Sequence, residues 1–315
     1  QISGLSIDQI GALTTSHVAS LSLDATKIKN LSTDQLSALN SGQIQALQIT
    51  AVSQLSPDQL IGLTTLQFKA LSANQVRVMT SAQLNSLSAE SLQAIDASDV
   101  AVINSATIRA LGSSQISSLG TEQIQKLTTA QVQALSSAQI QALSIDQITS
   151  LSKAGVSALT TLQVKSLTDD QLGGITAAQI QALSTSNIST LSTSQLSALN
   201  ASQFQALTAS QVGSLTSSQF NSLSEESLQA IDAGDVAALT TGTVSNISTT
   251  QLQRLTTTQI QALTTAEIRA LKTSQLSQLL TNQIAALSTA DISALTTEQL
   301  SSISSDQLLA LDTNQ

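Results

Sequence analysis

The sequence predicts an all-α fold, a solenoid of short helices of about five to seven residues, with one helix in every eight-residue repeat. Three observations point to it: an unbroken eight-residue period, a capping pattern inside each period, and a single proline placed where a helix would begin. The 35 octads between Leu31 and Leu311 keep one register, and their first and sixth positions are always apolar. Such regularity is typical of repeat proteins.

The period of eight excludes a long helix and a strand. A continuous helix needs apolar residues at a spacing near 3.6, whereas eight residues drift by about 80° around a helix axis. A strand would place the first and sixth positions on opposite faces, because side chains alternate along it. The pattern therefore favours a short helix that ends and restarts in each octad.

The octad Leu127–Ala134, LTTAQVQA, shows how each helix would start. Thr128 is a good N-cap and Gln131 follows three residues later, the spacing of a capping box. Leu127 and Val132 then occupy the two positions of a hydrophobic staple. Pro57 falls at the first helical position of its octad, where its missing N–H costs nothing.

A single octad cannot fold alone. Ordering its backbone costs roughly 8–16 kcal/mol, whereas two buried aliphatic side chains return roughly 3–6 kcal/mol and a cap about 1 kcal/mol. Neighbouring octads must therefore stack and share an apolar core, as in solenoids. Disorder is the alternative for so polar a chain, but disordered chains lack regularly spaced aliphatic residues.

Composition limits the possible functions. The net charge is −9, and there are three Phe, no Tyr and no Trp among 315 residues, which argues against a nucleic-acid partner. No run of eighteen apolar residues is present, so we expect no membrane span. The chain has no Cys, which excludes disulfides and thiolate metal sites.

We expect residues 1–315 to form one continuous α-solenoid. Residues 5–30 form N-terminal units in an offset register, because the unit at 21–30, LSLDATKIKN, is two residues longer than an octad. We interpret the insertion as a bulged connector, with a binding loop as the alternative. The repeat runs close to both ends without obvious polar caps, which favours a segment of a longer array.

A second, longer period lies over the octads. Residues 87–100 read LSAESLQAIDASDV, and residues 223–236 read LSEESLQAIDAGDV, so residues 31–311 comprise about two copies of a 136-residue module. The rarer residues at position five follow the same offset, as with Ser91 and Ser227. The module holds seventeen octads, an odd number, which argues against a turn of two equivalent octads.

Few residues suggest chemistry. His17 is the only histidine and occupies position five, where it most simply replaces Gln. Without Cys or a second His, catalytic triads and zinc sites are excluded, so we predict no enzymatic activity, no catalytic residues and no cofactor. Thr pairs such as Thr64–Thr65 could suggest an ice-binding array, but one Thr of each pair is expected to cap a helix and the other to face solvent.

The one candidate constellation is a set of carboxylates. Its main interpretation is a carboxylate version of the capping box, with Asp96 and Asp232 as caps and Asp99 and Asp235 three residues later. The functional alternative is a weak calcium site, since calcium prefers oxygen ligands. The candidate residues are Glu90, Asp96, Asp99, Glu225, Glu226, Asp232 and Asp235.

The repeated LTxxQ(I/V)xA motif, seen from Leu5 onward, resembles the octad arrays of very large bacterial secreted or cell-surface proteins that are described as adhesin-like. The resemblance implies a fibrous or stalk role at the cell surface and supplies no functional residues. The Leu-Thr-x-x-Gln core also resembles a motif of small periplasmic chaperones of the Spy type. In those proteins it occurs a few times within long helices, so chaperone function is not carried over.

Two functions follow as hypotheses. The first is a non-enzymatic structural segment of an extracellular bacterial filament, sheath or adhesin stalk, whose partner is itself or further repeats of a longer chain. The second is a solenoid binding module that presents a polar surface to peptides or glycans. A distinctive stripe of exposed residues would favour the binding module.

Overall fold

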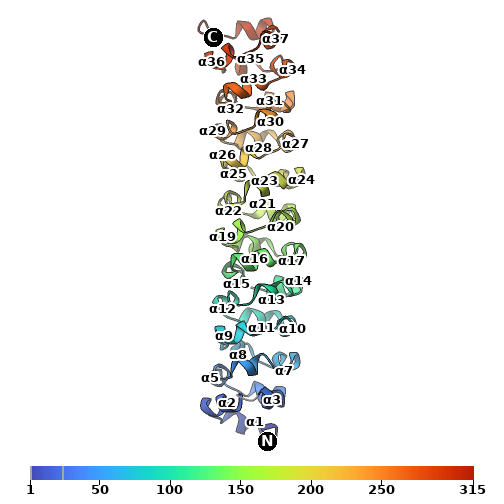
Figure 1. Cartoon of the computed structure of the whole chain (residues 1–315), viewed down its shortest axis with the longest axis vertical. Helices are drawn as coiled ribbons and strands as arrows, with labels where there is room; N and C mark the ends of the chain where they lie inside the picture. The colour runs from blue at the N-terminus through green and yellow to red at the C-terminus, as the bar shows by residue number, and fades with distance from the viewer. Residues whose placement is uncertain (1, 23–24) are drawn as a thin grey trace. The chain divides into compact units, whose positions relative to one another are not determined.

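The computed structural model describes residues 2–22 and 25–315, which form two compact units, Gln1–Leu159 and Thr160–Gln315. Across the described residues there are only short helices joined by turns, with no β-strand, so the predicted all-α repeat fold is confirmed (Figure 1). The join of the two units into one continuous solenoid stays a prediction.

Unit 1, drawn from blue to green in Figure 1, begins with a short 3-10 helix and continues with nineteen α-helices in its described part. These are η1 (Ile2–Gly4), α1 (Ile7–Gly11), α2 (Thr15–Ser22), α3 (Ala25–Lys29), α4 (Thr33–Ser37), α5 (Ser41–Gln45), α6 (Ile49–Val52), α7 (Pro57–Ile61), α8 (Thr65–Lys69), α9 (Ala73–Arg77), α10 (Ser81–Asn85), α11 (Ala89–Ala94), α12 (Ala97–Val100), α13 (Ser105–Arg109), α14 (Ser113–Ser117), α15 (Thr121–Lys126), α16 (Thr129–Ala134), α17 (Ser137–Ala142), α18 (Ile145–Ser150) and α19 (Lys153–Ser157).

Unit 2, drawn from green to red, is built from the same kind of element. Its helices are α20 (Thr161–Ser166), α21 (Asp169–Gly174), α22 (Ala177–Ala182), α23 (Thr185–Thr190), α24 (Thr193–Ser197), α25 (Ala201–Gln205), α26 (Ala209–Gly213), α27 (Ser217–Asn221), α28 (Glu225–Ala230), α29 (Ala233–Val236), α30 (Thr241–Val244), α31 (Thr249–Arg254), α32 (Thr257–Ala262), α33 (Thr265–Ala270), α34 (Thr273–Leu276), α35 (Thr281–Ala285), α36 (Thr289–Ser293), α37 (Thr297–Ser301) and α38 (Ser305–Leu309).

Most helices have the predicted five to seven residues, but five have only four and α2 has eight. In two of the four-residue helices, α6 and α34, the residues at the N-cap are Gln48 and Lys272, whose side chains make no capping bond. The end of so short a helix depends on a single hydrogen bond, so a weak bond moves it by a residue.

The predicted capping box starts most helices. In α16 the Thr128 hydroxyl accepts from the Gln131 N–H at 3.2 Å, while the Gln131 Oε1 accepts from the Thr128 N–H at 2.8 Å. Pro57 stands at the first position of α7, as predicted. Most octads therefore fix their own helix start through contacts between residues close in sequence.

The aliphatic side chains of positions one and six form the core of each unit. Leu127 and Val132 are 4% and 0% exposed, and almost every equivalent pair is buried in the same way. In unit 1 a small apolar cavity of about 10 Å³ is lined by side chains drawn from Ile10 to Leu47. Side chains from several consecutive octads therefore meet in one interior.

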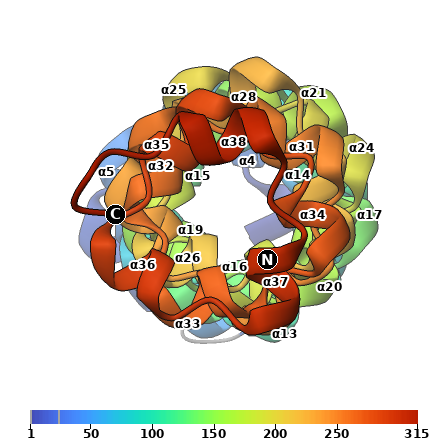
Figure 2. The same ribbon diagram turned by 90° about the horizontal axis from the view of Figure 1, so that it is seen from above.

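One turn of the coil takes between three and four octads. In unit 1 α8 packs on α11 and α12 on α15, and in unit 2 α25 packs on α28 and α29 on α32. Figure 2 shows the helices of unit 2 around a ring, with α31 and α34 on one side and α32 and α35 on another. A turn of two octads, which the odd module length argued against, is not formed within the described part of either unit.

Glutamine at position five joins successive turns. In α16 the Gln131 Nε2 donates to the carbonyl oxygens of Val100 and Ile103, each at 2.8 Å and 31 and 28 residues earlier. We call each such glutamine a rung. Other rungs that bond both carbonyls at these separations are Gln59, Gln67, Gln75, Gln83, Gln123 and Gln139 in unit 1, and Gln195, Gln203, Gln211, Gln219, Gln251, Gln259, Gln275, Gln283, Gln299 and Gln307 in unit 2.

The rungs explain how the chain tolerates its two-residue insertion. Across the insertion, Gln43 reaches the carbonyls of Leu13 and Ile10, 30 and 33 residues earlier, two more than in the regular rungs. The rung therefore keeps its two carbonyl partners across the insertion, and the choice between a bulged connector and a binding loop stays a prediction. Residues 23 and 24 of the insertion lie outside the described residues.

A second kind of cross-turn bond comes from position seven. The Asn85 Oδ1 accepts from the Gly112 N–H at 2.9 Å, and its Nδ2 donates to the Ala110 carbonyl at 3.1 Å. Asn221, the equivalent residue of the second module copy, makes the same two bonds with Ser248 and Asn246. The longer sequence period is therefore also a structural period.

Replacing Gln131 by Leu should lower the free energy of unfolding by roughly 2–4 kcal/mol. Leu fills similar space but leaves two carbonyls and one amide without their partners. Urea unfolding followed by circular dichroism measures the change, and Ser137→Ala on the exposed start of α17 is the control. Equal stability of the two variants would show that the rung contributes nothing.

Candidate functional site

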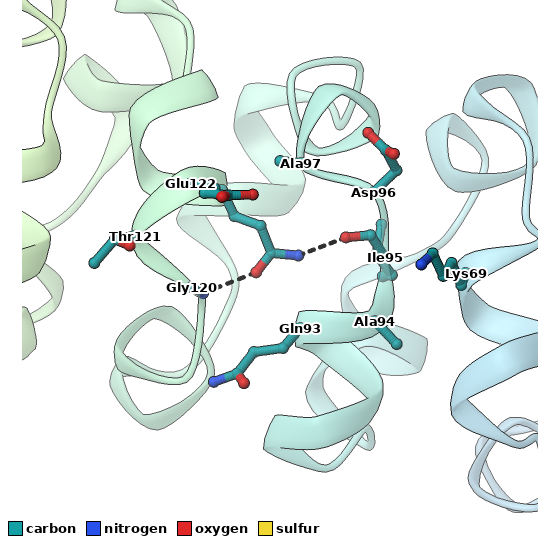
Figure 3. A pocket seen from close by; sticks show the side chains of 10 residues that line it. Lys69, Gln93, Ala94, Ile95, Asp96, Ala97, Gly120, Thr121 and Glu122 are labelled. Carbon is teal, nitrogen blue, oxygen red and sulfur yellow. Dashed lines mark hydrogen bonds between the residues drawn. The ribbon is translucent and has the colours of Figure 1, made fainter.

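A polar hollow lies on the surface of unit 1, across three successive turns. Its volume is about 610 Å³, against about 480 and 460 Å³ for two hollows of unit 2. Its walls come from the end of α8, the junction of α11 and α12, and the start of α15 (Figure 3). The lining residues are Lys69, Gln93, Ala94, Ile95, Asp96, Ala97, Gly120, Thr121, Glu122 and Gln123.

A rung crosses the middle of this hollow. The Gln123 Oε1 accepts from the Gly120 N–H at 2.9 Å, and its Nε2 donates to the Ile95 carbonyl at 2.8 Å, as the dashed lines of Figure 3 show. Gly120 occupies the N-cap of α15, where most octads have Ser or Thr. The missing side chain leaves space beside the rung, since the nearest atom to an added Cβ is 3.7 Å away.

Charged side chains border the hollow. In Figure 3 the carboxylates of Asp96 and Glu122 lie on one side of the rung, and the amide of Gln93 lies on the other. Hydrogen bonds from Ser98 lower the pKa of Asp96, and the positive charges of Lys69 and Lys126 lower it further. Asp96 is therefore a fixed negative charge beside a lysine, an arrangement suited to a polar ligand.

The structure corrects the predicted carboxylate capping box. The Asp96 Oδ1 accepts from the N–H and the hydroxyl of Ser98, at 2.9 and 2.6 Å, instead of from the amide of Asp99. Asp232 likewise accepts from the Gly234 N–H at 2.8 Å and not from Asp235. The short Asp side chain reaches the amide two residues on, an Asx-turn geometry.

The second carboxylate of each pair, Asp99 or Asp235, has a raised pKa. Burial raises the pKa of Asp99, and the neighbouring charge of Asp96 raises it further. Burial and the charge of Asp232 raise the pKa of Asp235 in the same way. The two acids of each pair therefore lie in different surroundings, the first in an Asx turn and the second partly buried.

The calcium candidates are spread over neighbouring helices. Glu90 lies in the first turn of α11, and Glu225 and Glu226 lie in that of α28, where the Glu225 Oε1 accepts from Gln229 at 3.1 Å. Among the described residues no three His, Asp or Glu side chains gather in a way that could hold a metal ion. The calcium hypothesis stays a prediction, and calcium titration followed by melting temperature is its test.

His17 takes the place of glutamine at its helix start. Its Nδ1 accepts from the Thr14 N–H at 3.3 Å, while its own N–H donates to the Thr14 hydroxyl at 3.2 Å. The side chain is therefore part of a capping contact, as the sequence predicted.

Sequence reasoning missed two features of the site. It identified Asp96 as a candidate but not Lys69 or Glu122, because single charged residues in different octads give no local signal. Comparison of the two module copies does give one: Lys69, Gly120 and Glu122 correspond to Gln205, Thr256 and Thr258 in the second copy. The charges of Lys69 and Glu122 are therefore particular to the first copy, whereas Asp96 has a counterpart in Asp232.

The fold defines the class: an all-α repeat protein whose short helices stack turn on turn within each unit. A family model described as the ALTTAQ repeat matches the chain five times, over residues 92–129, 125–153, 228–265, 260–289 and 284–315. Two of these matches, 92–129 and 228–265, begin at equivalent positions of the two module copies, in agreement with the longer period. No curated protein sequence matches the chain.

A search of the described residues finds no helix of the length and apolar character needed to cross a bilayer.

Proposed function

We propose that this chain is a non-enzymatic structural repeat protein, a segment of an extracellular bacterial filament, sheath or adhesin stalk. The supporting observation is the use of glutamine. The glutamine at position five of the octad is buried with both ends of its amide bonded to backbone, so it is committed to stacking. What remains on the surface is mainly Ser, Thr and Gln, with little reactive chemistry.

The location is proposed from two further observations. The octads resemble those of large secreted bacterial proteins, and the chain has no Cys or Trp and a single Met to be oxidised outside the cell. A surface rich in small hydroxyl side chains also suits a material exposed to solvent. The matches to a repeat family support the array itself.

Self-association is part of the proposal. In unit 2 Leu300 and Leu308 stand at position six, where Val132 and most others are fully buried, yet they are 48% and 49% exposed. A further turn of octads would cover them and would bring position-five glutamines to the carbonyls beside them. Further repeats of a longer chain or a second copy of this chain can supply such a turn, and we propose that one of these two partners covers this surface.

The purified chain should form particles whose length increases with concentration, visible by negative-stain electron microscopy and by light scattering. Leu308→Asp should shift the population toward single chains, because a charge would be buried in the contact. Leu309→Asp is the matched control, since Leu309 is 84% exposed at position seven. Single chains at every concentration would reject self-association, and equal effects of the two variants would reject this surface.

A binding module is the second candidate function, and the hollow beside Asp96 favours it. Lys69, Asp96 and Glu122 offer one ammonium and two carboxylates to a peptide or a glycan across three turns of unit 1. This is the kind of local departure from the repeat that a recognition site requires.

Peptide and glycan arrays test the binding function. A ligand of this hollow should bind the natural chain and lose at least about tenfold in affinity when Lys69→Gln and Glu122→Thr introduce the residues of the second copy. Gln205→Lys, at the equivalent place in the second copy, is the control and should leave binding unchanged. Absence of any bound probe, or equal binding by all variants, contradicts the binding function.

A further inference from the structure

Three position-five residues of unit 2 are acids, Asp235, Glu267 and Asp291. Glu267 lies in α33, is 2% exposed, and completes a capping box with Thr264. Its Oε2 accepts from the Thr264 N–H at 2.6 Å and from the Thr264 hydroxyl at 2.8 Å. Its Oε1 is buried and has no hydrogen-bond partner.

The register of the rungs shows what this oxygen faces. A rung donates to the carbonyls 31 and 28 residues earlier, which for Glu267 belong to Val236 and Leu239. With Oε2 in the place of a glutamine Oε1, the second oxygen takes the place of the donating Nε2. An ionised carboxylate has no hydrogen to donate, so three acceptors meet without a donor.

A second acid in the same stack avoids this conflict. Asp291, in the first turn of α36, also replaces glutamine and is 3% exposed. Its Oδ2 accepts from Ser288, and its Oδ1 accepts from the Thr265 hydroxyl at 3.0 Å. Because the Asp291 side chain is shorter, both of its oxygens accept hydrogen bonds. The buried oxygen without a donor is the Oε1 of Glu267.

We propose that Glu267 is a proton-dependent rung of unit 2. When it binds a proton from solvent, the Oε1 hydroxyl donates to the carbonyl of Val236 or Leu239 and joins two turns as glutamine does. When it is ionised, that bond is lost and two helix-end carbonyls face a buried negative charge. The device acts on the stability of the array and does not depend on polymerisation.

The two helices packed against α33 bring no cation to Glu267. Among the helices packed against α33, α30 carries no ionisable residue and α36 carries Asp291. Asp235 immediately precedes Val236, one of the two residues whose carbonyls lie at the rung separations from Glu267. Arg269 on α33 is exposed, and the Lys272 Nζ donates to the Asn246 Oδ1 at 3.2 Å.

The direction of the pH effect follows from burial. Burial raises the pKa of Glu267 above its ordinary value of 4.5, although the bonds from Thr264 lower it in part. The folded chain therefore holds this proton more tightly than the unfolded chain. The stability that Glu267 contributes is fully present below about pH 4.5 and is lost as the pH rises through the raised pKa.

The experiment compares melting temperature against pH, from about pH 5 to about pH 8, in three full-length chains. The natural chain should lose stability across this range relative to Glu267→Gln, which should melt roughly 3–6 °C higher at the alkaline end. Gln131→Glu places an acid at the equivalent rung of the first module copy and should introduce the same pH dependence there.

A local measurement distinguishes the effect of Glu267 on its own turns from the effect of pH on the stability of the whole chain. Hydrogen exchange of the peptide spanning residues 236–270 should become faster at high pH, beyond the intrinsic rate, in the natural chain but not in Glu267→Gln. Parallel pH profiles for the natural chain and Glu267→Gln would overturn the proposal. If Glu267→Gln fails to fold, a pH-independent Gln131→Glu chain overturns it instead.

Discussion

The structure depends on the side-chain amide of glutamine at position five. A helix of five or six residues leaves most of its last carbonyls without intrahelical partners. Buried carbonyls of this kind cost about 1–3 kcal/mol each when unsatisfied. The two hydrogens of the glutamine Nε2 satisfy two of them in the turn below, while its oxygen caps its own helix. One glutamine therefore satisfies unpaired backbone groups at helix termini in two different turns.

The local half of this arrangement could be predicted from the sequence. Within one octad, the capping box is formed by Thr128 and Gln131 and the hydrophobic staple by Leu127 and Val132. Residue type and spacing encode such short-range geometry. The long-range half could not be predicted, because the acceptors are backbone carbonyls of the preceding turn, several octads away in the sequence. The one available signal was the choice of glutamine over glutamate, since only the amide can donate.

The candidate site shows the same division. Asp96 was identified from its own octad. Its bond with Ser98 forms an Asx turn instead of the predicted capping box, and its place beside Lys69 depends on a neighbouring turn. The two module copies locate such sites better than any motif. Both copies keep the core and the cross-turn bonds of Asn85 and Asn221. They differ at Lys69, Gly120 and Glu122. They also differ at the rung Gln131, which is Glu267 in the second copy.

The central claim is that glutamine amides join successive turns within each unit, and hydrogen exchange of glutamine side chains tests it most directly. Nuclear magnetic resonance on the ¹⁵N-labelled chain should show slow exchange of the Nε2 hydrogens of buried rungs such as Gln75, Gln203 and Gln283. The exposed Gln45 and Gln205 should exchange at the rate of free glutamine. Equally fast exchange in both groups would contradict the account.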